Sequence, residues 1–121
     1  MSRFMKSLPE DHPKGWGKEI WITNSEKYCG KILCFDAGKK CSWHYHDVKD
    51  EVFYLLSGKM HVTVSDNDDI SSAETFILEK GEVFHVKTGL RHQMLAIETS
   101  ELLEVSTQHF ENDSIRLIKG D

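Results

Sequence analysis

The chain has 121 residues, of which 39% are hydrophobic and 29% are charged, and its formal net charge is −5. This length and balance predict one globular domain spanning residues 1–121, with a core that needs no disulfide framework. The acidic charge and the scattered Lys and Arg residues argue against a nucleic-acid-binding protein, because such proteins cluster their basic residues.

The thiols and the N-terminal segment indicate where the protein works. The three cysteines, Cys29, Cys34 and Cys41, are odd in number and form no CxxC motif, which favours reduced thiols. The N-terminal residues lack the apolar stretch of a secretion signal, and no apolar run approaches the length that spans a bilayer. We therefore expect a cytoplasmic protein with no membrane partner.

The chain opens with a segment that differs from everything after it. Residues 1–15 contain both prolines, Pro9 and Pro13, with charges between them, and we predict an irregular N-terminal arm. Short strand-like runs follow, and their ranges are 17–24, 28–38, 41–46, 51–58, 59–66, 75–82, 83–86, 91–98 and 101–108, with a possible last strand at 113–118.

The periodicity of these runs indicates an all-β fold. In residues 59–66, Met60, Val62 and Val64 alternate with polar side chains, which is the period of a half-buried strand. Residues 66–74 are acidic and predict a solvated loop. No stretch sustains a helical period, so the closely spaced short strands favour a β-sandwich or barrel.

The most informative stretch lies between Gly38 and Gly58. His44 and His46 are two residues apart, so in a strand both imidazoles point to the same side. Glu51 begins the next apolar run, and a short turn can bring it alongside them. Two imidazoles and a carboxylate in one space are suitable ligands for a divalent metal.

A second glycine-bounded histidine segment follows at residues 81–92. Its fixed points are Gly81, Gly89 and His92. Together the two segments resemble the two sequence motifs of the cupin superfamily. Lys87 replaces the proline and Ala96 the asparagine that are usual in the second motif.

The cupin resemblance implies a double-stranded β-helix, or jelly-roll barrel. It also implies one divalent transition metal, which is Mn, Fe, Ni, Co or Zn. The implied metal ligands are His44, His46, Glu51 and His92. Four protein ligands leave coordination positions open, so the metal would serve catalysis or small-molecule binding.

The remaining histidines and one cysteine receive weaker predictions. We expect His12, His61 and His109 at the surface. His85 lies among apolar neighbours and either faces solvent or points inward beside the metal. Strand alternation predicts that Cys41 faces away from the histidine ligands and has a structural role.

Outside these motifs, the chain resembles the cupin domain of type II mannose-6-phosphate isomerases. Trp16 and Gly17 match the opening of that domain, and residues 101–105 and 112–116 match elements near its end. Within the metal motif, His44 stands in place of a glutamine and Lys49 in place of an arginine.

This narrower resemblance implies interconversion of an aldose and a ketose, with a sugar or sugar phosphate as substrate. The candidate proton-transfer residues are Glu104, His85 and Lys49, while Tyr45 and Tyr54 are weaker alternatives. The candidate contacts to a phosphate or hydroxyl group are Lys31, Lys49, Arg91 and Arg116, each of which is otherwise a solvated surface charge.

Three other interpretations stay open from the sequence. One is an Fe²⁺-dependent dioxygenase with the same ligands, and another is a cupin that binds a sugar or small ligand without turnover. The third is an assembly module. A homodimer would then form through apolar outer strands, represented by Ile20, Ile22, Ile32 and Cys34.

Overall fold

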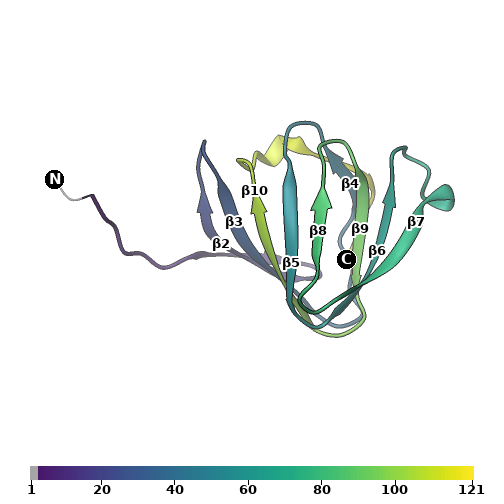
Figure 1. Cartoon of the computed structure of the whole chain (residues 1–121), viewed down its shortest axis with the longest axis horizontal. Coiled ribbons are helices and arrows are strands. Elements are labelled where there is room, and N and C mark those ends of the chain that lie inside the picture. Colours follow the sequence, from purple (N-terminus) through teal and green to yellow (C-terminus); the bar gives the residue numbers. More distant parts are fainter. Residues whose placement is uncertain (1–2) are drawn as a thin grey trace.

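The computed structural model describes residues 3–121, which form two antiparallel sheets that face each other (Figure 1). The strands are β1 (Glu10–Lys14), β2 (Gly17–Asn24), β3 (Cys29–Phe35), β4 (Trp43–His46), β5 (Glu51–Ser57), β6 (Lys59–Ser65), β7 (Glu74–Glu79), β8 (Val83–Val86), β9 (Arg91–Ala96), β10 (Ser100–Ser106) and β11 (Ser114–Ile118). Two 3₁₀ turns, η1 (Ile70–Ser72) and η2 (Glu111–Asp113), are the helical elements of the described residues.

The strand order establishes the jelly-roll. The six-stranded sheet has the order β1-β2-β3-β10-β5-β8, and the five-stranded sheet has the order β11-β4-β9-β6-β7. Strands that are neighbours in the chain are therefore often separated between the two sheets, as β4 and β5 are. The prediction of an all-β jelly-roll is confirmed.

The prediction of an irregular arm over residues 1–15 is wrong for residues 10–14. Residues 10–14 form β1, which pairs with β2 at the edge of the six-stranded sheet. Pro13 is compatible with this strand because an edge strand needs its backbone donors on one side only. The part of the arm described before β1 extends away from the barrel (Figure 1).

The glycines that bound the motifs turn the chain between strands. Gly58 joins β5 to β6 with φ at +93°, a conformation that L side chains rarely adopt. A Cβ atom at this position would also collide with Ser100. The spacing of the first motif therefore includes a backbone requirement as well as metal ligands.

The apolar core fills the closed part of the space between the sheets. Leu33, Leu102 and Leu55 lie side by side across β3, β10 and β5, and all three are buried. Met60, Val62 and Met94 cover them from the five-stranded sheet. The same inner surface becomes polar toward the other end of the barrel, where the candidate site lies.

Strand β2 reverses the usual polarity of a barrel strand. Glu19 lines the interior, whereas Ile22 lies on the outer face with 54% of its surface exposed.

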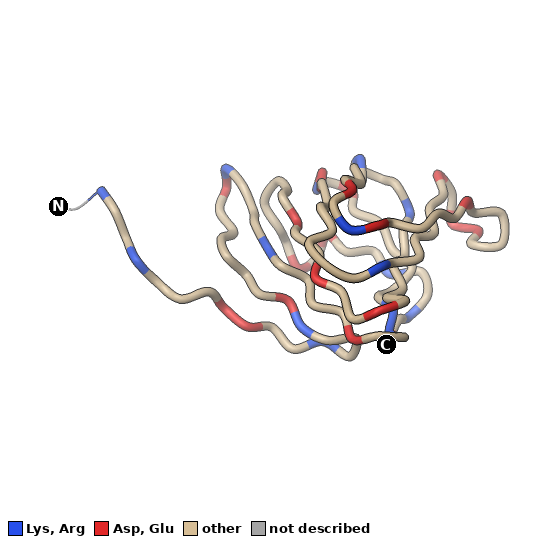
Figure 2. Tube along the Cα trace, turned by 60° about the horizontal axis from the view of Figure 1, so that its bottom comes forward, with Lys and Arg blue, Asp and Glu red and all other residues tan. Residues whose placement is uncertain are grey.

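Acidic and basic residues are interspersed along the whole trace (Figure 2). Among residues 3–121, no helix has the length and apolarity needed to cross a membrane.

Candidate metal centre

Three histidines come together on the inner side of the five-stranded sheet. His44 on β4 pairs directly with His92 on β9, and His46 lies two residues along β4 from His44. Each of the three offers one ring nitrogen, and these atoms all lie within 4.8 Å of one another. Strand alternation and one cross-strand pair thus place all three imidazoles together. We call this group the imidazole wall.

Backbone carbonyls fix the orientation of all three rings. The Nδ1 atoms contact the carbonyl oxygens of Ser42 at 2.8 Å, Asp113 at 3.0 Å and Leu90 at 3.0 Å, for His44, His46 and His92 respectively. A ring nitrogen facing a carbonyl must carry the proton, so Nε2 keeps its lone pair in the neutral ring. This arrangement holds the Nε2 atoms ready for a cation.

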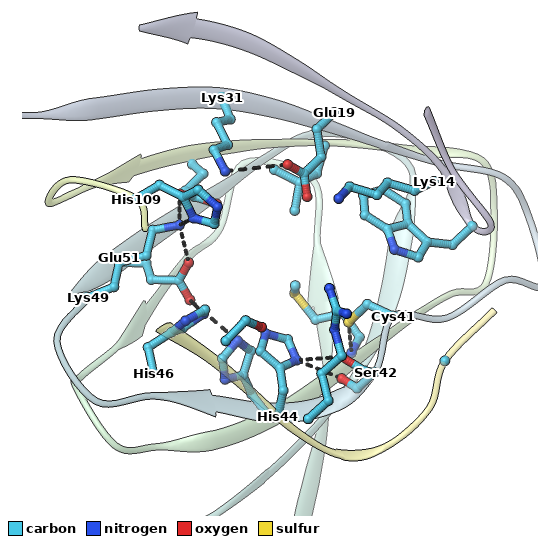
Figure 3. A pocket seen from close by; sticks show the side chains of 18 of the residues that line it. Lys14, Glu19, Lys31, Cys41, Ser42, His44, His46, Lys49, Glu51 and His109 are labelled. Carbon is cyan, nitrogen blue, oxygen red and sulfur yellow. Dashed lines mark hydrogen bonds and ion pairs between the residues drawn. The ribbon is translucent and has the colours of Figure 1, made fainter. Parts of the chain in front are cut away.

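Glu51, the first residue of β5, adds a carboxylate from the opposite sheet (Figure 3). Its Oε2 lies 3.4 Å from His46 Nε2 and 3.3 Å from His92 Nε2. Glu51 Oε2 and His92 Nε2 are buried and have no hydrogen-bond partner among the described residues. Since buried polar atoms are normally satisfied, these facing acceptors fit a shared divalent cation.

The pKa values of the cluster also fit a bound divalent cation. Burial, reinforced by His92, lowers the pKa of His44 well below 6.5. Burial opposes ionisation of Glu51, but His46, His92 and Lys49 outweigh it and hold the pKa well below 4.5. Burial also lowers the pKa of His46, but Glu51 prevails and raises it, so a metal would displace that proton.

Asp113 holds the loop between His46 and Glu51. Its carboxylate accepts backbone N–H bonds from Asp47 at 2.9 Å, Val48 at 3.0 Å and Lys49 at 3.0 Å. Its carbonyl also accepts from His46, so one residue ties β4, the loop and the start of β11 together. Asp113 therefore positions two ligands without contacting the metal position.

The cavity beside the metal centre has a volume of about 280 Å³. Its other side belongs to the six-stranded sheet and the adjoining loop, and we call it the charged wall. Its members are Glu19, Lys31, Lys49 and Glu104. Figure 3 shows Lys31 and Glu19 across the cavity from His44.

Lys49 is the centre of the charged wall. Its Nζ lies 2.6 Å from Glu104 Oε2, 3.3 Å from Glu51 Oε1 and 3.3 Å from His109 Nδ1. Burial disfavours the charged form of Lys49, but Glu104 and Glu51 outweigh it and raise the pKa. Burial and the charge of Glu51 raise the pKa of Glu104. The cation thus keeps two buried carboxylates side by side.

Comparison with known proteins identifies the family. The family profile described as the Cupin domain matches residues 31–106, which include all four candidate ligands. The chain is a cupin. A search of curated proteins finds no significant match for it.

Solved structures with the same fold are distant in sequence. The capsular polysaccharide assembling protein CapF from Staphylococcus aureus is 16% identical with a TM-score of 0.79, over 93% of this chain and 35% of CapF. KdgF from Halomonas sp. is 16% identical with a TM-score of 0.72, over 85% of this chain and 91% of KdgF.

Oxalate decarboxylase from Bacillus subtilis is 20% identical with a TM-score of 0.78, over 90% of this chain and 30% of the enzyme. The cupin described here thus spans about a third of the length of CapF and of oxalate decarboxylase. These likenesses show a common fold, and they leave the activity to be argued from the site.

The structure places the predicted catalytic residues differently. Glu104 and Lys49 line the cavity of the cupin. His85 does not, because it lies opposite the outward-facing Val52 on the edge strand β8. Its Nε2 contacts Asp50 at 2.9 Å, and 44% of the side chain is exposed. The expectation that His85 acts beside the metal is therefore wrong.

The expectations for Cys41 and His109 need correction, whereas Arg91 takes the surface position that was its alternative to a substrate contact. Cys41 lines the cavity, since it precedes β4 and the strand alternation does not reach it. His109, expected at the surface, also lines the cavity. Arg91 faces away from the cavity, where it stacks on Tyr45 at 3.7 Å and contacts Asp68.

Sequence reasoning missed Glu19, whereas it named Lys31 as a candidate substrate contact or a solvated surface charge. Ile20 and Ile22 were expected on an outer face, but Glu19 on the opposite face of the same strand was not singled out. The side of β2 that carries Glu19 faces the cavity, and Ile20 and Ile22 lie on the other side.

Proposed function

We propose that this cupin is a metal-dependent isomerase that interconverts an aldose and a ketose of monosaccharide size. The observation that carries the proposal is the placement of Glu104 in the same cavity as the metal ligands. Its Oε2 is held by Lys49 at 2.6 Å and by the Ser106 hydroxyl at 2.8 Å. Its Oε1 has no hydrogen-bond partner among the described residues and is available to a substrate.

Glu104 has the properties of a general base for this reaction. A carboxyl whose pKa is raised by burial and by Glu51 is a stronger base than a solvated one. Lys49 and Ser106 fix its orientation, which reduces the freedom lost when a substrate binds. The metal, when bound, would polarise the carbonyl and the adjacent hydroxyl oxygen.

The proton transfers balance without an external reactant. Glu104 Oε1 takes the proton from C2 of the aldose and returns it to C1, so one C–H bond breaks and another forms. A second proton moves from the C2 hydroxyl to the C1 oxygen. The aldehyde becomes an alcohol, and the C2 alcohol becomes the ketone.

The size and ligand chemistry of the site support the same reaction. A cavity of about 280 Å³ accepts one small molecule, at the lower end of the range for ligand pockets. The donor set of three imidazoles and one carboxylate suits Mn, Fe, Co, Ni or Zn. Mn²⁺ is the first metal to test, because the fold neighbour oxalate decarboxylase contains Mn(II) centres.

The test is turnover of aldoses, ketoses and their phosphates by metal-loaded protein in D₂O, followed by NMR. We expect interconversion of one pair with deuterium entering at C1 or C2. The Glu104→Gln variant should lower kcat about 10²- to 10⁴-fold with its metal content unchanged. Oxygen uptake without isomerisation would favour the dioxygenase alternative, and binding without turnover would favour a non-catalytic cupin.

The homodimer is also a proposal. The outer face of the six-stranded sheet carries partly exposed apolar side chains in adjacent strands, and examples are Ile20, Ile32 and Leu103. A second copy covering this face would remove them from water. Light scattering at micromolar concentration should give the mass of two chains, and the mass of one chain would contradict the proposal.

A further inference from the structure

Lys31 in the charged wall has partners for only part of its donor capacity. Its Nζ donates to Glu19 Oε1 at 3.4 Å and lies 4.1 Å from the centroid of the Trp21 ring. An ammonium group has three N–H donors. At least one donor of Lys31 is therefore without a hydrogen-bond acceptor among residues 3–121, whereas Lys49 has three polar partners.

This lysine is buried and directed into the cavity. Only 1% of its surface is exposed, and it lines the same cavity as the metal ligands. Figure 3 shows its ammonium group pointing into the space opposite His44. Burying a cation costs several kcal/mol, and the Glu19 carboxylate and the Trp21 ring offset this cost from one side only. An incompletely paired ammonium group at a cavity wall is a candidate contact for a polar group of a ligand.

Its position in the sheet is fixed by the register of three strands. Lys31 on β3 lies between Trp21 on β2 and Glu104 on β10. The aromatic ring and the Glu19 carboxylate hold the ammonium from one side. The proposed base Glu104 is its neighbour on the other side. A substrate group bound by Lys31 would thus lie next to the reacting atoms.

The charge of the cavity favours an anion. Two buried lysines and a divalent ion would face three buried or half-buried carboxylates, Glu19, Glu51 and Glu104, which leaves one net positive charge. Three further cations, Lys14, Arg116 and Lys119, and two further acids, Glu111 and Asp121, also line the cavity. The lining side chains therefore balance in charge, and a bound divalent ion makes the cavity positive. A positive cavity in a chain of net charge −5 would concentrate anionic ligands.

We propose that Lys31 binds an anionic oxygen group of the substrate, either a carboxylate or a phosphate. The inference rests on the proposed function in that the other end of the same molecule lies at the metal centre. A charge-assisted hydrogen bond from a buried ammonium is about twice as strong as a neutral one. Lys31 therefore selects acidic sugars over neutral sugars.

The test is calorimetric binding of three probes, gluconate, glucose 6-phosphate and glucose, to metal-free and to Mn²⁺-loaded protein. We expect at least one charged probe to bind about 10-fold more tightly than glucose. Tighter binding of gluconate assigns a carboxylate substrate, and tighter binding of glucose 6-phosphate assigns a phosphate. Equal affinity for all three probes would overturn the inference.

Two variants separate a direct contact from the general charge of the cavity. Lys31→Met keeps the length of the side chain and removes the ammonium. The double variant Lys31→Met with Glu19→Gln removes both members of the ion pair, so the net charge of the protein is unchanged. It replaces the single variant if that protein fails to fold because the Glu19 carboxylate has lost its partner. In both variants, the ratio of the affinity for the charged probe to the affinity for glucose should fall to near one.

Lys18→Met is the matched control, since Lys18 is exposed on β2 and does not line the cavity. It should retain the preference of the wild-type protein. A preference that survives in both Lys31 variants would show that the metal or the outer cations bind the anion. Charge-selective binding without turnover would refute the isomerase alone, and turnover without charge selection would refute the role of Lys31 alone.

Discussion

The two walls of the cavity carry different chemistry and are built in different ways. In the imidazole wall, neutral rings are oriented by backbone carbonyls, and the ligands come from short motifs. In the charged wall, lysines and glutamates orient one another across β2, β3, β10 and the loop before β5. The first wall needs local spacing and one cross-strand pair, His44 with His92, whereas the second depends on the register of several strands far apart in the chain.

This difference predicts which changes affect stability and which affect ligand binding. Neutral imidazoles cost little to bury, and their unused nitrogens are reserved for a cation. Buried charges tolerate the loss of a partner poorly, because the remaining charge stays in a medium of low dielectric constant. We therefore expect substitutions in the charged wall to lower the stability of the metal-free protein more than substitutions in the imidazole wall.

The largest stability effect should come from Lys49→Met. This change leaves Glu51 and Glu104 buried without the cation between them. We expect the free energy of unfolding of the metal-free protein to fall by about 3–5 kcal/mol, measured in urea.

The matched control is Lys59→Met, because Lys59 pairs with Glu79 at 3.7 Å on the surface. Its cost should stay below about 1 kcal/mol. Similar small costs for the two lysines would show that the charged wall is not the stabilising element that we describe.

Asp113→Ala should have a smaller effect on stability and a larger effect on metal affinity. The carboxylate accepts three loop N–H groups between two ligands. We expect about 1–3 kcal/mol of lost stability and about 10- to 100-fold weaker metal binding, measured by urea unfolding and by competition with a chelator.

Asp113→Asn retains one carboxyl-type oxygen and should fall between the wild-type protein and Asp113→Ala. If Asp113→Ala lost stability but bound metal with unchanged affinity, the loop would not position His46 and Glu51. The imidazole wall would then be independent of the strand that completes it.

The smallest effect should be a change in pH dependence at His109. Burial, together with Lys31 and Lys49, lowers the pKa of His109 to about 4. The unfolded chain binds this proton near pH 6.5, so His109 makes stability fall as the pH drops from about 6.5 to 4.

His109→Gln should lower the slope of the free energy of unfolding against pH by up to one proton, which is about 1.4 kcal/mol per pH unit at most. The measurement is urea unfolding of the metal-free wild-type protein and variant at several pH values in this range. Parallel pH profiles for the two proteins would contradict the placement of His109 beside the lysines of the charged wall.

Sequence reasoning recovered the elements that depend on local patterns. Ten strands from β2 to β11 were visible as short strand-like runs, and the four candidate ligands were implied by the resemblance to the cupin motifs. It missed β1, because prolines were taken to exclude a strand, although an edge strand tolerates Pro13. It left open whether His85 faces solvent or the metal, since the register that turns this residue of β8 outward cannot be read from VFHV alone.

The charged wall could not be predicted for the same reason. Lys31 and Lys49 were considered as substrate contacts, but surface solvation was the simpler interpretation for each. Their burial depends on Glu19 and Glu104, which reach them only after β2, β3, β10 and β5 have paired. His109 enters the cavity because Asn24 holds its backbone through two hydrogen bonds across the barrel end.

Metal analysis after loading with Mn²⁺ and removal of excess ion tests the central claim most directly. The wild-type protein should retain about one ion per chain, and so should His61→Ala, whose side chain does not line the cavity. His46→Ala and Glu51→Ala should each bind metal at least about 100-fold more weakly and retain little of it. Stoichiometric metal in both ligand variants would contradict the assignment of this centre.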